Sequence, residues 1–496
     1  MVFSSFTFLF MFFPIFLLFY YVSPNKYKNL ILFIFSLFFY AWGEPIYILI
    51  MIFSTINDFT FGQLIYKHKF EQNNHKKAKM FLILSIIINL SLLGFFKYTP
   101  LILDIIETYS LKINATTIYN YIRNCNANWN IALPIGISFY TFQTMSYSID
   151  IYRGVSKPQK NIVDFGAYVA MFPQLIAGPI VSYNKIEKYL NVKYRNEKID
   201  FEAGSMIFVL GLIEKVILAN SIGNLWDNYK IFSNNGLNGS LFGNWIGISF
   251  FALQIFFDFS GYSHMAIGLG KILGFDFPQN FKSPYLCDSI TDFWRRWHIT
   301  LGSWFRDYVY IPLGGNRKGL KRQLINLSIV WFLTGLWHGA AYNFILWGLY
   351  FGFIIILEKI FILKILKKIP KLFSHIYSII LILIGWVLFA IEDINLLKNY
   401  LTNMFCLSDV NLVIDTFSIE LILSNMGLLI LAFVFIVYNK EDNWTNNILK
   451  MKFNDKYCPF CQNVYFYHKA LLLFGFFVSI YFLLSSTYNP FLYFNF

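Results

Sequence analysis

The sequence predicts an all-α, multi-pass membrane protein. Of its 496 residues, 57% are hydrophobic, 21% are aromatic and only 14% are charged, whereas soluble domains average about 25% charged residues. Apolar stretches long enough to cross a bilayer also recur along most of the chain. A soluble protein would have to bury all of these stretches in one core, so we set a soluble fold aside.

Roughly twelve apolar stretches are expected to span the membrane. The first has no basic residues before it and is predicted to be a retained span, not a cleaved signal peptide. Residues 164–181 are interrupted by Pro173, Gly178 and Pro179, so a re-entrant or buried segment is expected there, because irregular backbone is tolerated only inside the protein. The predicted spans lie near residues 7–23, 29–42, 46–65, 80–96, 131–149, 203–220, 241–258, 324–341, 342–360, 376–391, 417–438 and 470–486.

The net charge of +13 has two possible meanings, affinity for nucleic acid or the excess of Lys and Arg in cytoplasmic loops. The basic clusters can all be placed on one side of the membrane, with both termini on the other side. No nucleic-acid partner is therefore needed. The clusters are 26–28, 67–79, 153–160, 185–198, 295–322, 359–371 and 440–456.

The cysteines do not form a disulfide framework. Cys458 and Cys461 make a single C-x-x-C without a second pair, and two loop thiols that happen to be close explain it as well as a zinc or redox site. We expect no metal site. The other cysteines are Cys125, Cys287 and Cys406.

His338 is the most informative residue, because it lies within the apolar, aromatic stretch 324–350. An ionisable side chain inside a membrane costs about 2.5 kcal/mol or more unless it lines a cavity or has a partner. Gly335 and Gly339 are expected to leave room beside the imidazole. Two interpretations remain open. The histidine could be hydrogen-bonded to a neighbouring helix, or desolvation could keep it neutral, so that it acts as a base on a hydroxyl attacking an acyl carbonyl.

The second informative segment is residues 291–308, where a helical projection predicts one amphipathic helix. Arg295, Gly302 and Arg306 share a face, and His298 lies at its margin. Such a helix is typical of a membrane surface, where its arginines would meet lipid phosphates. The opposite face is aromatic and apolar, with Phe293, Trp297, Leu301, Trp304, Tyr308 and Ile311.

A glycine-rich basic stretch follows at residues 311–319. Its backbone amides, with Arg317 and Lys318 nearby, could hold a phosphate. The stretch lacks the Walker spacing, so nucleotide binding does not follow. A basic cytoplasmic loop is the alternative interpretation.

These motifs resemble the membrane-bound O-acyltransferase (MBOAT) superfamily, and more narrowly its bacterial alginate O-acetyltransferase branch. Residues 333–340 are similar to the sequence around that family's active-site histidine. The resemblance covers about residues 1–390, and 391–496 would add C-terminal spans to one integral membrane domain, 1–496. The other matching segments are 2–5, 39–42, 134–143, 172–179, 292–298, 304–308 and 311–317.

The resemblance implies a ring of roughly twelve tilted helices with re-entrant segments around a transmembrane tunnel. It implies that His338 is catalytic and that His298 supports it. A cytoplasmic thioester, acetyl-CoA or another, would donate the acyl group, with no bound cofactor. His338 would act as general base on the acceptor hydroxyl or on a partner's serine, and His298 would position the donor or stabilise the oxyanion. A basic surface would face the donor, formed by Arg295, Arg306, Arg317 and Lys318.

For the acceptor, the resemblance implies an extracytoplasmic glycan such as peptidoglycan, alginate or another wall polysaccharide. A secreted or periplasmic serine acetyltransferase would be the partner, and the enzyme would lie in the bacterial cytoplasmic (inner) membrane, in contact with the lipid bilayer. One alternative is D-alanyl transfer to teichoic acid. Another is a transporter or flippase without chemistry, which would not explain two histidines that each lie inside a family signature.

Overall fold

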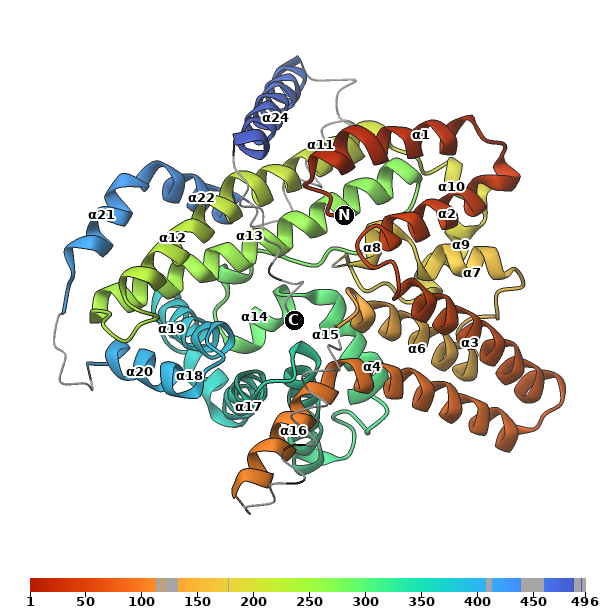
Figure 1. Ribbon diagram of the computed structural model, residues 1–496, viewed down its shortest axis with the longest axis horizontal. Helices are drawn as coiled ribbons and strands as arrows, with labels where there is room; N and C mark the ends of the chain where they lie inside the picture. Colours follow the sequence, from red (N-terminus) through yellow and green to blue (C-terminus); the bar gives the residue numbers. More distant parts are fainter. Residues whose placement is uncertain are drawn as a thin grey trace.

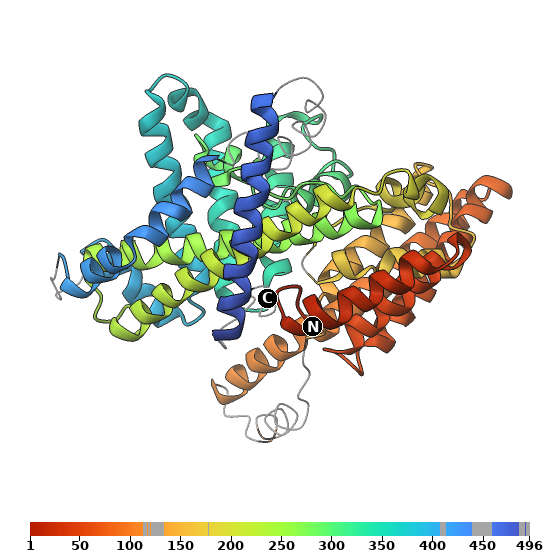
Figure 2. The ribbon, with the colours of Figure 1, turned by 90° about the horizontal axis from the view of Figure 1, so that it is seen from above.

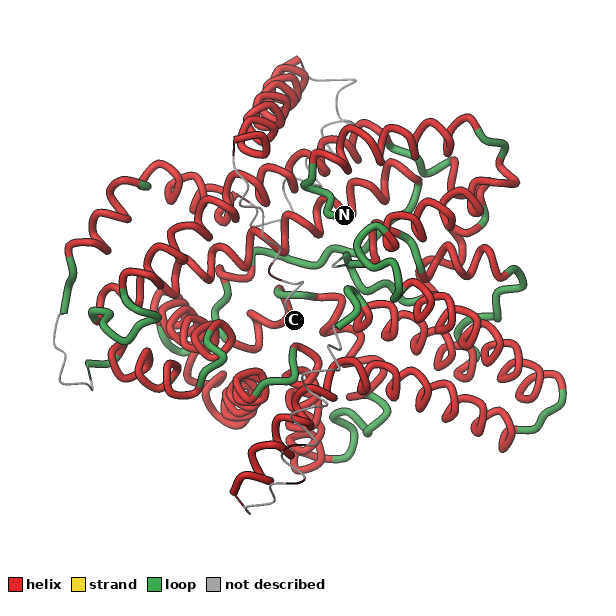
Figure 3. The backbone as a smooth tube through the Cα atoms, in the orientation of Figure 1, coloured by secondary structure: helices red, strands yellow, loops and turns green. Residues whose placement is uncertain are grey.

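The computed structural model describes residues 1–112, 117, 120, 133–176, 178–406, 413–438, 459–485 and 492, and these residues form helices joined by loops (Figure 3). No strand occurs among them. The all-α prediction is therefore confirmed for this part of the chain. The C-x-x-C lies outside the residues whose side chains are described, so the interpretation of its thiols stays a prediction.

A first group of helices comes from the N-terminal part of the chain. It consists of η1 (Phe8–Phe12), α1 (Phe13–Val22), η2 (Asn25–Tyr27), α2 (Lys28–Ala41), α3 (Ile48–Tyr66), η3 (Lys67–Glu71), α4 (His75–Lys112) and α6 (Ile137–Arg153). The buried Asp58 of α3 joins three of these helices. Its carboxylate accepts hydrogen bonds from Ser85 at 2.7 Å and Asn89 at 2.9 Å, both in α4, and from Ser148 of α6 at 3.4 Å.

Four short helices follow, and the first two overlap the stretch 164–181 that the sequence predicts to be re-entrant or buried. They are α7 (Ile162–Val169), α8 (Phe172–Leu175), α9 (Tyr183–Leu190) and α10 (Val192–Asn196). Residues 165–176 are all buried, and Pro173 lies in the first turn of α8. Within the predicted stretch 164–181 the helices are too short to span the membrane, and the described residues are buried apart from the partly exposed Asp164, as predicted.

Two long elements cross the molecule side by side (Figure 1). One is the continuous run α11 (Phe201–Ile213), η4 (Glu214–Ala219) and α12 (Asn220–Phe232), and the other is α13 (Leu241–Leu273). Glycines allow the close approach, since a Cβ on Gly268 would lie 2.6 Å from the Gly204 carbonyl oxygen. A buried ion pair between Lys215 and Asp258 and a buried hydrogen bond between His264 and Glu214 connect the helices.

The remaining helices surround two short central ones, α14 (Ile290–Arg296) and α15 (Ile299–Phe305), which lie in the middle of Figure 1. Figure 2 shows α24 (Pro459–Ser485) crossing the long pair, and its Leu472 packs against α11. The other elements are η5 (Pro284–Leu286), η6 (Arg306–Tyr310), α16 (Gly319–His338), α17 (Tyr342–Leu357), η7 (Glu358–Ile362), α18 (Leu363–Leu366), α19 (Lys371–Ala390), α20 (Ile394–Met404), α21 (Thr416–Ser424) and α22 (Met426–Tyr438).

Six helices in the described part are long and apolar enough to cross a membrane, and α21 with α22, bent by 68°, could form a seventh span. This agrees with a multi-pass membrane protein, but the ring of roughly twelve helices around a tunnel stays a prediction. The predicted span 131–149 is not one of the six, because its helix has only 17 residues and many of them are polar. It corresponds to α6, whose side chains are nearly all buried inside the protein instead of facing lipid. The six helices are Ile48–Glu71, His75–Glu107, Phe201–Phe232, Leu241–Leu273, Lys371–Ala390 and Phe466–Ser485.

Candidate active site

His338 is the last residue of α16, and its side chain is buried, with 4% exposure. The helix ends because Gly339 is extended, with φ −173° and ψ 166°. Three aromatic rings surround the imidazole, with centroid distances of 4.9 Å to Trp337, 4.8 Å to Trp347 and 5.4 Å to Phe389. The terminus of α16 therefore holds the imidazole in a desolvated aromatic enclosure.

The two glycines beside His338 have a different role from the predicted one. A Cβ on Gly335 would lie 2.5 Å from the Phe344 carbonyl oxygen, and one on Gly339 would collide with the Phe344 ring. Both glycines therefore allow α17 to pack directly against α16. The expectation that they leave open space beside the imidazole is wrong, because α17 fills that space.

His298 lies at the break between α14 and α15. Its backbone is left-handed, with φ 45° and ψ 54°, a conformation that is uncommon for residues other than glycine. Asn280 Oδ1 accepts three hydrogen bonds there, from His298 Nδ1 at 3.0 Å, from the Thr300 amide at 3.2 Å and from Thr300 Oγ1 at 2.9 Å. Asn280 therefore holds the histidine and the start of α15 together.

The contact with Asn280 also fixes the tautomer of His298. A carbonyl oxygen can only accept, so His298 Nδ1 carries the proton and Nε2 carries the lone pair. Burial lowers the pKa of His298 to about 3. The imidazole is therefore neutral at physiological pH, and its Nε2 is an unprotonated hydrogen-bond acceptor.

The structure brings the two histidines together around one indole ring. The Trp337 ring lies 6.0 Å from the His298 ring and 4.9 Å from the His338 ring, centroid to centroid. Phe139 of α6 contacts both Trp337 and His298, and Phe259 of α13 meets His298 edge-on at 4.7 Å. Residues 40 positions apart in the sequence thus form one buried site.

A small cavity of about 140 Å³ reaches His298 from the side of α15 and α16. Its walls are otherwise apolar and aromatic apart from Thr334, and among the described residues that line it His298 alone is titratable. Gly302 lines the cavity and is also exposed at the surface. Such a cavity suits a small, uncharged group that must approach a histidine without bulk water.

The comparisons with known proteins agree with this arrangement. The model of the family described as "MBOAT, membrane-bound O-acyltransferase family" matches residues 128–397, which include both histidines and the cavity. The chain belongs to this family. The acyltransferase is 35% identical to the probable alginate O-acetylase AlgI of Azotobacter vinelandii over the full length of both proteins.

Two further relatives show the range of acceptors in the family. The acyltransferase is 32% identical to the peptidoglycan O-acetyltransferase of Helicobacter pylori, over 82% of this chain and 80% of the relative. It is 29% identical to the teichoic acid D-alanyltransferase of Bacillus subtilis, over 45% of this chain and 58% of the relative. All three relatives are acyltransferases, so a transporter without chemistry is set aside.

The basic residues of the acyltransferase that were predicted to bind the donor do not join the histidines. Arg295, Arg306, Arg317 and Lys318 are all exposed, and none of them lines the cavity. Arg306 forms an ion pair with the neighbouring Asp307 at 2.7 Å. Their role in donor binding stays a prediction. In the described part of the chain, no group of His, Cys, Asp or Glu is arranged to hold a metal ion.

The single amphipathic helix predicted over 291–308 is wrong. The left-handed backbone of His298 divides it into α14 and α15, and its aromatic side faces protein. Trp304 stacks on Phe142 with ring centroids 3.8 Å apart, and its Nε1 donates to the Phe142 carbonyl oxygen at 2.9 Å. His298 is consequently buried instead of lying at a surface margin.

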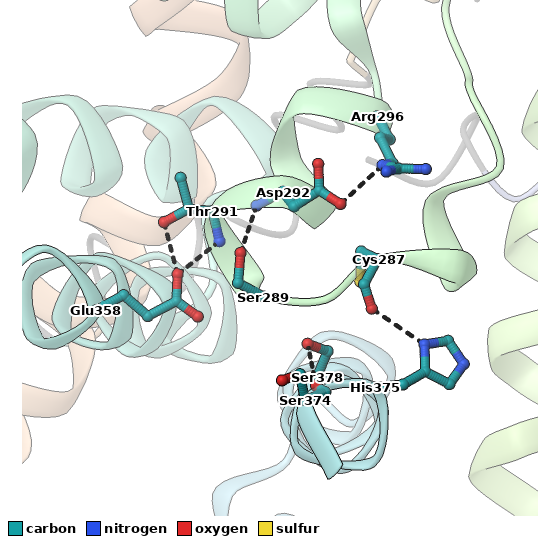
Figure 4. Close-up of polar contacts among 9 residues, drawn as sticks. All are labelled: Cys287, Ser289, Thr291, Asp292, Arg296, Glu358, Ser374, His375 and Ser378. Carbon is teal, nitrogen blue, oxygen red and sulfur yellow. Dashed lines mark hydrogen bonds and ion pairs between the residues drawn. The ribbon is translucent and has the colours of Figure 1, made fainter. Parts of the chain in front are cut away.

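Glu358 fixes the start of α14 in the acyltransferase, as Figure 4 shows. Its fully buried carboxylate accepts hydrogen bonds from the amides of Ile290 at 2.7 Å and Thr291 at 2.8 Å, and from Thr291 Oγ1 at 2.6 Å. Ser289 Oγ accepts from the next amide, that of Asp292. The first amides of α14, which have no partner within the helix, are therefore all bonded.

We expect Glu358→Leu to lower the free energy of unfolding by about 2–4 kcal/mol, because it leaves buried amides without an acceptor. Thermal unfolding of the purified protein in detergent measures the change. Asp292→Asn is the matched control, since this carboxylate lies on the same helix in a partly exposed pair with Arg296 and its loss should cost less than about 1 kcal/mol. Equal effects of the two variants would contradict the capping role.

The sequence interpretation missed two residues that shape the site. Asn280 lies in a loop between helices, and no motif in the sequence around it marks it as a residue of the site. Lys97 directly follows the predicted span 80–96, so in the sequence it indicates only where that span ends. In the structure Lys97 is buried within α4 and donates to the carbonyl oxygen of Trp337, next to His338.

Proposed function

We propose that this protein is a bacterial inner-membrane O-acetyltransferase that moves an acetyl group from a cytoplasmic thioester to an extracytoplasmic glycan. The observation that carries the proposal is the buried pair His298 and His338 around Trp337, inside the family-matched segment. Acetyl-CoA is the proposed donor, and a secreted serine acetyltransferase is the proposed partner. Peptidoglycan, alginate or another wall polysaccharide is the acceptor.

Two observations support acetyl over other acyl groups. The relatives that match over most of their length are named for alginate or peptidoglycan acetylation, whereas the D-alanyltransferase matches less than half of this chain. The cavity at His298 has a volume of about 140 Å³, well below the roughly 300–1,000 Å³ of pockets for drug-sized ligands. A long acyl chain would not fit there.

In the proposed reaction His338 takes the proton from the acceptor hydroxyl while its oxygen attacks the thioester carbonyl. A carbon–oxygen bond forms, the carbon–sulfur bond breaks, and the proton passes from His338 to the leaving thiolate. The acceptor hydroxyl belongs either to the glycan or to the partner's serine. The aromatic rings around His338 exclude water, which would otherwise hydrolyse the thioester.

The tautomer of His298 favours one of its two predicted roles. Stabilising an oxyanion requires a donor, but His298 Nδ1–H already donates to Asn280, and Nε2 is an acceptor. His298 is therefore better suited to hold an N–H or O–H group of the donor than to stabilise the oxyanion. We assign it the role of positioning the thioester beside His338.

The test is the ester-linked acetyl content of wall and capsule glycans in cells with and without the gene. We expect base-labile acetate to disappear from one polymer, which would name the acceptor. Loss of ester-linked D-alanine instead would favour teichoic acid as the acceptor. Unchanged ester groups on every polymer would contradict the proposal.

A further inference from the structure

Helix α4 supplies two neighbouring hydrogen-bond donors to the end of α16. Lys97 Nζ donates to the carbonyl oxygen of Trp337, and Tyr98 Oη donates to the carbonyl oxygen of Leu336 at 2.7 Å. These carbonyls lie in the last turn before His338. Residues about 240 positions apart thus meet at the terminus that carries the histidine.

The local structure of α16 explains why donors are needed there. Because Gly339 is extended and ends the helix, the last carbonyl groups have no amide four residues ahead to accept from. Buried carbonyls without a partner destabilise a protein, so such groups are almost always bonded. A cation at this position also interacts favourably with the negative end of the helix dipole.

Capping alone does not explain a lysine at position 97. Lys97 is 5% exposed and lies within a membrane-crossing helix, where an ammonium group is costly unless it is paired or functional. No carboxylate in the described part of the chain pairs with it, and its hydrogen bond goes to a neutral carbonyl. Tyr98 shows that a neutral side chain can cap the same turn.

The position of the Lys97 amino group suggests what this residue does. Lys97 Nζ lies 5.8 Å from the Trp337 ring, the ring that contacts both His298 and His338. The Lys97 amino group thus holds the peptide bond that immediately precedes His338. It also lies beside the Trp337 ring, which contacts both imidazoles.

We propose that Lys97 is a positioning residue for His338. Its hydrogen bond to the Trp337 carbonyl fixes the last peptide of α16, and this peptide determines the direction of the imidazole. The proposal rests on the proposed function, in which His338 is the base. Loss of the hydrogen bond lets the imidazole turn away from the hydroxyl without weakening donor binding.

The experiment compares Lys97→Met, Lys97→Gln, Tyr98→Phe and His338→Ala in the full-length protein. Transfer of labelled acetyl from acetyl-CoA to base-labile esters is measured in membrane vesicles, together with thermal unfolding of each purified variant. We expect Lys97→Met to lower kcat about tenfold or more, with the KM for acetyl-CoA within about twofold of wild type. Lys97→Gln, which keeps an N–H donor, should recover at least about a third of the wild-type kcat.

Tyr98→Phe removes the other hydrogen bond to the last turn of α16. It therefore measures how much a loss of stability alone lowers the activity. Its kcat should stay within about threefold of wild type, although its thermal midpoint falls as much as that of Lys97→Met. Equal kcat values for Lys97→Met and Tyr98→Phe, or no recovery with Lys97→Gln, would overturn the positioning role. Activity retained in His338→Ala would instead overturn the proposed function, so the two failures are distinguishable.

Discussion

We expect His338→Ala to abolish acetyl transfer while the protein remains inserted and folded. Removing a general base typically costs about 10²–10⁴-fold in rate, and no second histidine occupies the end of α16. The imidazole is enclosed by the rings of Trp337, Trp347 and Phe389. Its removal leaves a small cavity whose cost, about 1–3 kcal/mol, a protein with so large a core can tolerate.

Ester-linked acetate on the acceptor polymer, relative to the amount of protein in the membrane, measures this effect. His375→Ala is the control, because His375 is a partly buried histidine of α19 that contacts the Cys287 carbonyl, away from the site. It should keep nearly normal activity. A normal acetyl content in the His338→Ala strain would contradict the assignment of the base.

His338 could be found from the sequence because its signal is local. A titratable side chain in an apolar, aromatic stretch is anomalous wherever the helix lies, and the surrounding motif resembles a known family. The assignment to the membrane proteins could also be made from the sequence, because it depends on composition alone. Neither inference requires knowledge of which residues meet in space.

The geometry around His298 could not be predicted in this way. A period of 3.6 residues fits residues 291–308 as one helix, and the left-handed break occurs at a histidine, where no glycine marks it. The residue that stabilises the break is Asn280, 18 positions earlier. Likewise the sequence around Lys97 does not reveal that α4 meets the end of α16, because that contact is set by tertiary packing.

The expected number of roughly twelve spans stays a prediction for a related physical reason. Hydropathy cannot distinguish a helix that faces lipid from one that is buried among other helices, because both are apolar. Helix α6 is enclosed on nearly every side, and polar residues such as Gln143 lie in its buried surface. The central helices α14 and α15 are short for the same reason, since they lie within protein and need not match the bilayer thickness.

The second large effect is expected for His298→Asn, which separates the chemical role of His298 from its backbone role. Asparagine tolerates the left-handed conformation better than most residues, so the break between α14 and α15 should persist. The acceptor Nε2 that positions the thioester is lost, and we expect kcat/KM for the thioester to fall about a hundredfold or more. Acetyl transfer from labelled acetyl-CoA in membrane vesicles gives this ratio.

His298→Val is the partner variant, because a β-branched residue adds backbone strain of about 1–2 kcal/mol at a left-handed position. We expect both variants to lose activity but only His298→Val to unfold at a clearly lower temperature. If His298→Asn kept wild-type kcat/KM while His298→Val lost it, the residue would serve only to turn the chain. Because His298 Nδ1 is held by Asn280 and the residue lines the cavity, we expect the chemical role to dominate.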